Sequence, residues 1–276
     1  MTESTGSFLK HNLREYGMLI SLVAIMAFFQ FMTDGTLLQP LNLTNLVLQN
    51  SYIVIMALGM LLVIVAGHID LSVGSVVGFI GALAAVLMVQ FEWHFVPATL
   101  VCLLAGAAIG AAQGWFVAFF RIPSFIVTLA GMLVFKGLSL ALLQGQSVGP
   151  FPTSFQLLSS GFIPDALSGE SLRTTSLLVG IAGAFALIVA KLRERANQAR
   201  HGMESEPTPF FIGKNLIFVA LIVAFSWKLA SYKGLPNVLI IMTLLMLLYD
   251  FVTTRTTVGR RIYALGGTRR RRGCRA

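Results

Sequence analysis

The sequence predicts an all-α protein, a polytopic membrane helix bundle of about eight transmembrane helices with one broken helix near residues 67–74. Of the 276 residues, 56% are hydrophobic and only 11% are charged. A soluble domain has about 25% charged residues. Apolar stretches of about 20 residues, the length that spans a hydrocarbon core, recur along the chain. These observations indicate an integral membrane protein.

Hydropathy predicts the spans in chain order. They lie at residues 17–33, 51–67, 72–90, 97–119, 122–143, 174–191, 214–232 and 235–252. No small-residue cleavage site follows the first span, so we interpret it as retained and not as a signal peptide. The predicted organisation is a cytoplasmic N-terminus (1–16), a transmembrane domain (17–252) with an external loop (144–173) and a cytoplasmic loop (192–213), a short cytoplasmic segment (253–267) and a basic tail (268–276).

The distribution of basic residues predicts the orientation. If the N-terminus is inside and the spans alternate, 16 of the 20 Lys and Arg residues fall in inner segments and three in outer segments, with Lys136 inside a span. The positive-inside rule favours this orientation over its reverse. The net charge of +9 is therefore explained by topology and contact with membrane lipid, and we expect no nucleic-acid partner.

One stretch, GHIDLSVGSVVG at residues 67–78, interrupts the apolar pattern. An ionisable residue in an apolar tract is costly in a membrane, so Asp70 is a candidate functional residue. The stretch also carries helix-break signals, because Gly67 can end one helix and Asp70 can cap the next. We expect Gly67, Asp70, Ser72 and Gly74 to form a broken-helix or gate site. Asp70 either caps and orients the broken helix or acts directly in gating.

Small residues at four-residue spacing predict close helix packing. They are Gly106, Gly110 and Gly114 in one span, and Gly74, Gly78 and Ala82 in the helix after the break. Residues at this spacing share a helix face and let backbones approach closely in lipid. We therefore expect the helix after the break to lie deep in the bundle, away from lipid.

Other features leave alternatives open. Lys136 could reach the interface, pair with an acid or line a pathway. The external loop is either a docking surface for an outside partner or an ordinary connection. At residues 191–200, KLRERANQAR could extend the preceding helix into the cytoplasm.

Composition offers little for catalysis. Cys102 and Cys274 give neither a disulfide framework nor metal spacing, and we expect no metal and no cofactor. His68 and Asp70 form a weak His-x-Asp pair, because residues two apart on a helix point to different faces. The sequence contains no Walker-type phosphate-binding loop.

Several stretches together resemble permease subunits of bacterial ATP-binding-cassette importers of the ribose, xylose, galactose and multiple-monosaccharide type. The first is the break stretch. The second is RIPSFIVTLAGMLVFKGLSL at residues 121–140, and the third is VGRRIYALGG at residues 258–267. The external QGQSVGPFPTSF is similar to that of the multiple-monosaccharide branch. The resemblance covers nearly the whole chain through Gly267.

The resemblance implies a non-enzymatic transport subunit in the bacterial inner membrane. Such permeases have about ten helices and work in pairs, here expected to be a homodimer. They assemble with cytoplasmic ATPase subunits and receive monosaccharide from a periplasmic sugar-binding protein. By resemblance, Arg260, Tyr263, Ala264, Gly266 and Gly267 belong to the segment that couples to the ATPase. Alternatively, Arg260 and Arg261 merely anchor the helix end to anionic lipid.

The C-terminal stretch departs from the family pattern. Thr268 replaces an expected Asn, and an arginine run follows in place of further spans. We interpret the chain as a truncated or frameshifted product, which puts its transport competence in doubt. A genuinely shorter variant with a basic tail is the alternative.

Two other function classes compete with the permease interpretation. Asp70 could carry a proton in an ion-gradient-driven secondary transporter, a class that also uses broken helices. An intramembrane enzyme would need a nucleophile or an acid–base pair within reach, and His68 with Asp70 is the sole candidate pair.

Overall fold

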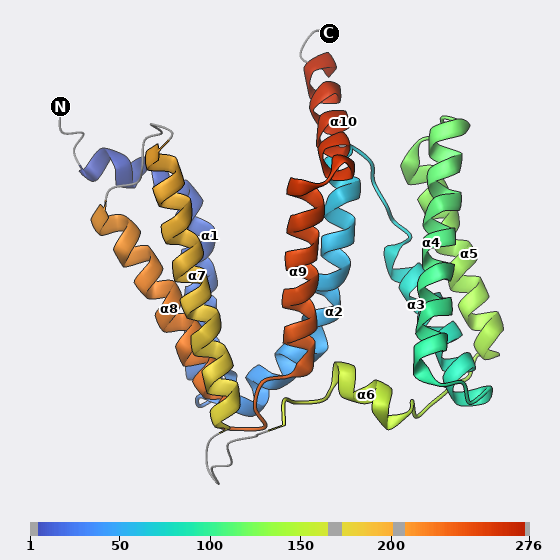
Figure 1. The fold of residues 1–276 in the computed structure, drawn as a ribbon, viewed down its shortest axis with the longest axis horizontal. Helices are drawn as coiled ribbons and strands as arrows, with labels where there is room; N and C mark the ends of the chain where they lie inside the picture. Colours follow the sequence, from blue (N-terminus) through green and yellow to red (C-terminus); the bar gives the residue numbers. More distant parts are fainter. Residues whose placement is uncertain (1–4, 165–172, 201–207, 274–276) are drawn as a thin grey trace. The chain divides into compact units, whose positions relative to one another are not determined.

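The computed structural model describes residues 5–164, 173–200 and 208–273. Its regular elements are helices, and the chain divides into two compact units (Figure 1). Unit 1 comprises Met1–Val47 and Phe162–Leu235, and unit 2 comprises Leu48–Gly161 and Pro236–Ala276. We describe each unit by itself.

Unit 1 is built around two long paired helices. Its helices are α1 (Thr5–Met32), η1 (Thr36–Leu38), the first turns of α2 (Pro40–Val65), α7 (Thr174–Arg200) and α8 (Thr208–Ala230). The helices α7 and α8 lie side by side (Figure 1). At their contact, a Cβ added to Gly180 would overlap the Ser226 side chain, so the glycine permits this approach. Further along the pair, the Arg195 guanidinium lies 4.6 Å from the centroid of the Phe211 ring.

Unit 2 contains the predicted break. Its helices are the rest of α2, α3 (Val73–Ala85) with a π-helical turn η2 (Val86–Gln90), α4 (Phe95–Phe119), α5 (Ser124–Leu143), α6 (Thr153–Ser159), α9 (Asn237–Arg255) and α10 (Thr257–Gly273). Helix α3 packs against both α4 and α5, whereas α9 contacts α6 and α10. The break between α2 and α3 spans seven residues, 66–72.

The buried core of unit 2 lies at the far end of α3 from the break. Ala84, Met88, Ala98 and Cys102 form this cluster, and Phe151 and Phe155 from the α6 region pack against it with other apolar side chains. Mostly small side chains let α3 and α4 approach here. This packing fixes the end of α3 opposite the candidate site.

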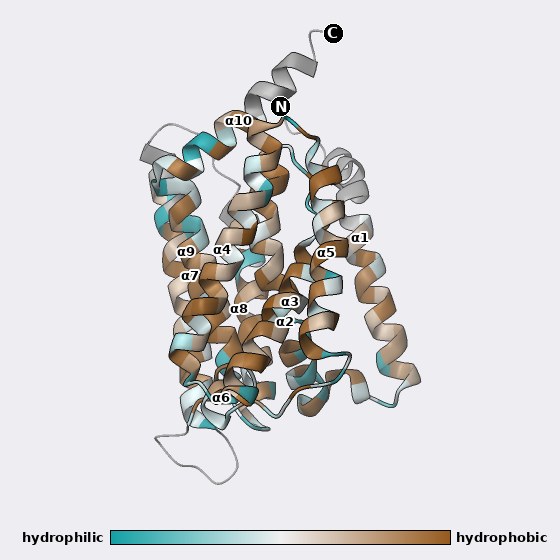
Figure 2. Ribbon diagram, turned by 90° about the vertical axis from the view of Figure 1, so that its right-hand side faces the viewer, coloured by the Kyte–Doolittle hydropathy of each residue, from teal (hydrophilic) through white to brown (hydrophobic). Residues whose placement is uncertain are grey.

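The described helices have the composition of membrane spans. Seven are long and apolar enough to cross a membrane, and residues 20–32 of α1 form a shorter apolar helix. The long helices are predominantly hydrophobic, with hydrophilic residues concentrated towards their ends and connections (Figure 2). Many large apolar side chains are exposed, as expected for helices that face hydrocarbon. The predicted all-α polytopic architecture is confirmed.

Helix boundaries differ from the predicted ones where polar residues lie inside a helix. Helix α2 begins at Pro40 and not near residue 51, because proline suits a first helical position and the polar side chains after it are tolerated in a helix. Residues 191–200 extend α7, as predicted. Part of the predicted external loop is helix α6, and its residues 165–172 lie outside the described part of the chain.

The C-terminal helix extends beyond the predicted short cytoplasmic segment. Helix α10 runs through to Gly273, into the stretch predicted as a basic tail. Among the seven candidate spans, α3 with its π-helical turn has the largest share of buried residues, 28%. Gly74 and Gly78 of the predicted small-residue row are exposed, so the position of this helix away from lipid stays a prediction.

Candidate functional site at the helix break

The end of α2 forms a defined turn at Gly67. Gly67 has a φ of 79°, in the left-handed region that favours glycine. Its N–H donates to the Ile64 carbonyl at 2.9 Å, and the His68 N–H donates to the Val63 carbonyl at 3.1 Å. These two bonds are those of a Schellman motif, which ends a helix and satisfies its last carbonyls. Gly67 therefore ends α2 as the sequence predicted.

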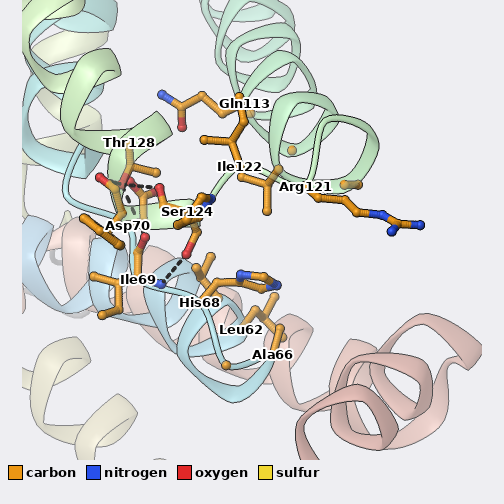
Figure 3. Close-up of a pocket in the computed structure, with 18 of the residues that line it drawn as sticks. Leu62, Ala66, His68, Ile69, Asp70, Gln113, Arg121, Ile122, Ser124 and Thr128 are labelled. Carbon is orange, nitrogen blue, oxygen red and sulfur yellow. Dashed lines mark hydrogen bonds between the residues drawn. The ribbon is translucent and has the colours of Figure 1, made fainter. Parts of the chain in front are cut away.

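Helix α5 satisfies the backbone of the break. The Ile69 N–H donates to Ser124 Oγ at 3.2 Å (Figure 3). The Thr128 hydroxyl donates to the Ile69 carbonyl at 3.3 Å. Thr128 also lies 3.0 Å from the Ser124 carbonyl. Irregular backbone at membrane depth needs such protein partners because lipid offers none. Ser124 and Thr128 thus hold the break against the start of α5.

Asp70 acts within the break itself. Its Oδ1 accepts the Ser72 N–H at 2.8 Å and the Ser72 hydroxyl at 2.7 Å. Ser72, and not Asp70, occupies the residue before the first helical position, Val73, and its own side chain makes no capping bond. The N-cap therefore lies two residues later than expected, at Ser72 instead of Asp70. Asp70 still supplies the acceptor for the backbone N–H of this N-cap residue.

Ser72 joins the break to α4 through Gln113. The Ser72 side chain is 1% exposed, and its Oγ lies 3.2 Å from both amide atoms of Gln113. A Cβ added to Gly131 of α5 would overlap the Gln113 amide nitrogen. The glycine therefore leaves the space in which Gln113 reaches Ser72. We call Asp70, Ser72 and Gln113 the polar cluster.

Sequence reasoning identified Asp70 and Ser72 but missed Gln113 and Gly131. The available signal was a lone amide in an otherwise apolar span, between Gly110 and Gly114. Gly74 is exposed at the start of α3, and no atom beyond its chain neighbours and the helix backbone lies within 4 Å of a Cβ added there.

A cavity of about 1060 Å³ adjoins the break. It is lined by the end of α2, the break, the end of α4, the start of α5 and Ile262 of α10. Gly110 and Gly114 form part of its α4 wall. Arg121 lies at its edge with the side chain extended away from Asp70 (Figure 3).

The glycine row of α4 does not make the predicted close contact within unit 2. No unit 2 atom beyond the helix's own backbone and chain neighbours lies within 4 Å of a Cβ added to Gly106, Gly110 or Gly114. Two of these glycines instead widen the cavity. Helix packing through this row stays a prediction.

Helix α10 reaches the end of α2. A Cβ added to Gly266 would overlap the carbonyl oxygen of Val65, the last residue of α2. Arg260, Tyr263 and Ala264 are exposed on α10. Gly267 lies in α10, but its surroundings are outside the described structure. Gly266 is thus a predicted coupling residue that the structure brings to the end of α2.

The described part of the chain offers no evident metal centre, since no three His, Cys, Asp or Glu side chains there are grouped to hold an ion. His68 lines the cavity together with Asp70. Lys136 is exposed on α5. The site has the features of a structured helix break beside a cavity.

A family described as "Branched-chain amino acid transport system / permease component" matches residues 42–272, which include the break, the cavity and most of α10. The chain belongs to this family. No solved structure matches it.

Individual relatives within this permease family are named for sugar transport. The xylose transport system permease protein XylH of Escherichia coli (strain K12) is 36% identical over 256 residues, which cover 93% of this chain and 63% of that protein. The XylH protein of Haemophilus influenzae is 35% identical over 258 residues, covering 93% and 66%. The ribose import permease protein RbsC of E. coli (strain K12) is 39% identical over 141 residues, covering 51% and 43%. The chain thus spans about two thirds of the length of its XylH relatives.

Proposed function

We propose that the chain is a transmembrane permease subunit of an ATP-driven importer of monosaccharides, a pentose or a hexose. The observation that carries this proposal is the similarity to XylH over 93% of the chain. The protein would provide part of the translocation pathway, and ATP hydrolysis would take place on separate subunits.

The proposed assembly follows from this role. Cytoplasmic ATPase subunits would contact the α10 region, a second copy of the permease would complete a homodimer, and a periplasmic sugar-binding protein would deliver the substrate. The inner membrane would hold the chain with its N-terminus in the cytoplasm, as the distribution of basic residues favours.

The geometry of unit 2 supports such a role. Gly266 of α10 contacts the end of α2, and Ile262 of the same helix lines the cavity beside the break. A displacement of α10 by an ATPase would therefore act on residues that border the cavity. A transport subunit needs this kind of mechanical link, because the free energy of ATP enters outside the permease.

Purification from membranes with a tag on the chain tests the proposal. We expect an ATPase subunit to co-purify, and uptake of labelled xylose or ribose to require both proteins. Uptake should survive an uncoupler that collapses the proton gradient while ATP is maintained. Uptake that stops with the uncoupler under these conditions would instead indicate a secondary transporter.

A further inference from the structure

We propose that Gln113 and Gly131 are positioning residues that hold the helix break in one conformation, and that α10 acts on this conformation through Gly266. The significance of this link for transport rests on the proposed function. The link itself is a property of unit 2 and can be measured without transport.

The break is held on one side and has space on the other. Ser124 and Thr128 bind the backbone of Ile69, while Asp70 and Ile69 also border the cavity of about 1060 Å³. The segment can therefore move toward the cavity once its hydrogen bonds release. Two discrete arrangements of such a segment would provide the bistable element that a switch requires.

Gln113 connects the break to α4 at a buried point. Its amide contacts the Ser72 hydroxyl, which also donates to Asp70, so the three side chains form one network. Gly131 leaves room for the Gln113 amide at this point, because a Cβ there would overlap the amide nitrogen. Three helices, α3, α4 and α5, thus determine the position of Ser72.

Helix α10 contacts the other end of the break. Ile262 and Gly266 are four residues apart and share one face of α10. This face lies against the cavity through Ile262 and against the Val65 carbonyl through Gly266. Val65 is two residues before Gly67, whose turn is closed by bonds to Val63 and Ile64. A shift of α10 therefore displaces the turn at which the break begins.

Hydrogen exchange of the purified chain in lipid nanodiscs tests the positioning role. We expect Gly131→Ala and Gln113→Ala each to raise exchange in the peptide covering residues 66–72 by about three- to tenfold, as for the loss of one hydrogen bond. The double variant should exchange no faster than Gln113→Ala alone, because the shortened side chain removes the overlap. Gly137→Ala is the matched control, since no atom beyond α5 and its neighbours lies within 4 Å there. Equal exchange in Gly131→Ala and Gly137→Ala, or additive effects in the double variant, would overturn the proposal.

The same measurement on Gly266→Ala tests the link to α10. Exchange at residues 66–72 should rise relative to Gly137→Ala, although the substitution lies in another helix. An unchanged break would show that α10 does not act on it. Uptake by the unsubstituted chain with its ATPase tests the proposed function separately from the link between α10 and the break. Failed uptake would contradict the proposed function, whereas the exchange result on the link would remain valid.

Discussion

At the scale of single residues, Ser72 is the point at which the polar contacts of unit 2 converge. Its N–H and hydroxyl both donate to Asp70, and its hydroxyl also contacts Gln113 of α4. A fully buried hydroxyl in this position is stabilising only while its partners remain. Changes to those partners should therefore have larger effects than changes to exposed polar residues nearby.

Asp70 provides the first test at this scale. Asp70→Asn keeps an acceptor oxygen for the Ser72 N–H but removes the charge, and we expect near-normal transport and stability. Asp70→Leu leaves that N–H unpaired, which costs about 1–3 kcal/mol, so both thermal stability and uptake should fall. Uptake assays and thermal unfolding of the two purified variants check this. Loss of uptake in Asp70→Asn at unchanged stability would favour a direct role of the charge in gating.

The sequence predicted this site only in part. Gly67 and Asp70 were recognisable because glycine and an acid stand out in an apolar tract. Gln113 and Gly131 were not, because their partners are distant along the chain and the Gln113–Ser72 contact joins residues 41 positions apart. Spacing within one helix carries no information about such a contact.

At the scale of helices, the α7–α8 pair shows a requirement for glycine that the sequence did not reveal. Gly180 and Gly183 both lie in α7, yet only Gly180 faces the Ser226 side chain. Gly183 has no atom beyond its helix and neighbours within 4 Å. Two glycines in one helix therefore have different structural roles.

This difference predicts the effect of alanine at each position. Gly180→Ala should destabilise unit 1 by about 1–3 kcal/mol through overpacking, whereas Gly183→Ala should be neutral or stabilising. Thermal unfolding in detergent measures both. Adding Ser226→Gly should restore stability to Gly180→Ala, because it removes the side chain that the new Cβ would overlap. A loss of stability that persists in the double variant would contradict the packing explanation.

The contact of α10 with the end of α2 predicts an effect on the coupling of ATP hydrolysis to uptake. Leucine at Gly266 and Gly267 should separate α10 from the end of α2, so ATP hydrolysis continues while sugar uptake decreases. Parallel assays of hydrolysis and uptake in the complete transporter measure this ratio. Arg260→Ala separates the two interpretations of this residue: a lower ratio of uptake to hydrolysis would support a coupling role, and an unchanged ratio would support lipid anchoring. Normal uptake in the Gly266 and Gly267 variant would argue against the proposed contact.

Most helices were predictable because each span is a long apolar stretch. The exceptions have physical reasons. The start of α2 contains Asn42, Thr44 and Asn45, which lower hydropathy without preventing a helix. Helix α6 has only seven residues, too few for a periodic signal. The glycine row of α4 indicated a close approach, but its spacing could not distinguish a helix contact from a cavity wall.

At the scale of the whole molecule, the distribution of charge predicts the orientation in the membrane. Ser159 of α6 is expected outside, and Arg261 of α10 is expected in the cytoplasm. In a background with both native cysteines replaced by serine, an impermeant maleimide should label Ser159→Cys in spheroplasts. It should label Arg261→Cys only after the membrane is opened. The reverse pattern would show that the positive-inside rule does not decide the orientation of this chain.

The contacts of Ile69 also affect how the protein is made. Its N–H and carbonyl pair with residues 55 and 59 positions later in the chain. At translation rates of about 5–20 residues per second, those partners emerge from the ribosome roughly 3–12 s after Ile69. Until then the break has no protein donors or acceptors from α5. We therefore expect the Ile69 backbone to stay hydrated until α5 is made and to enter the lipid together with α5.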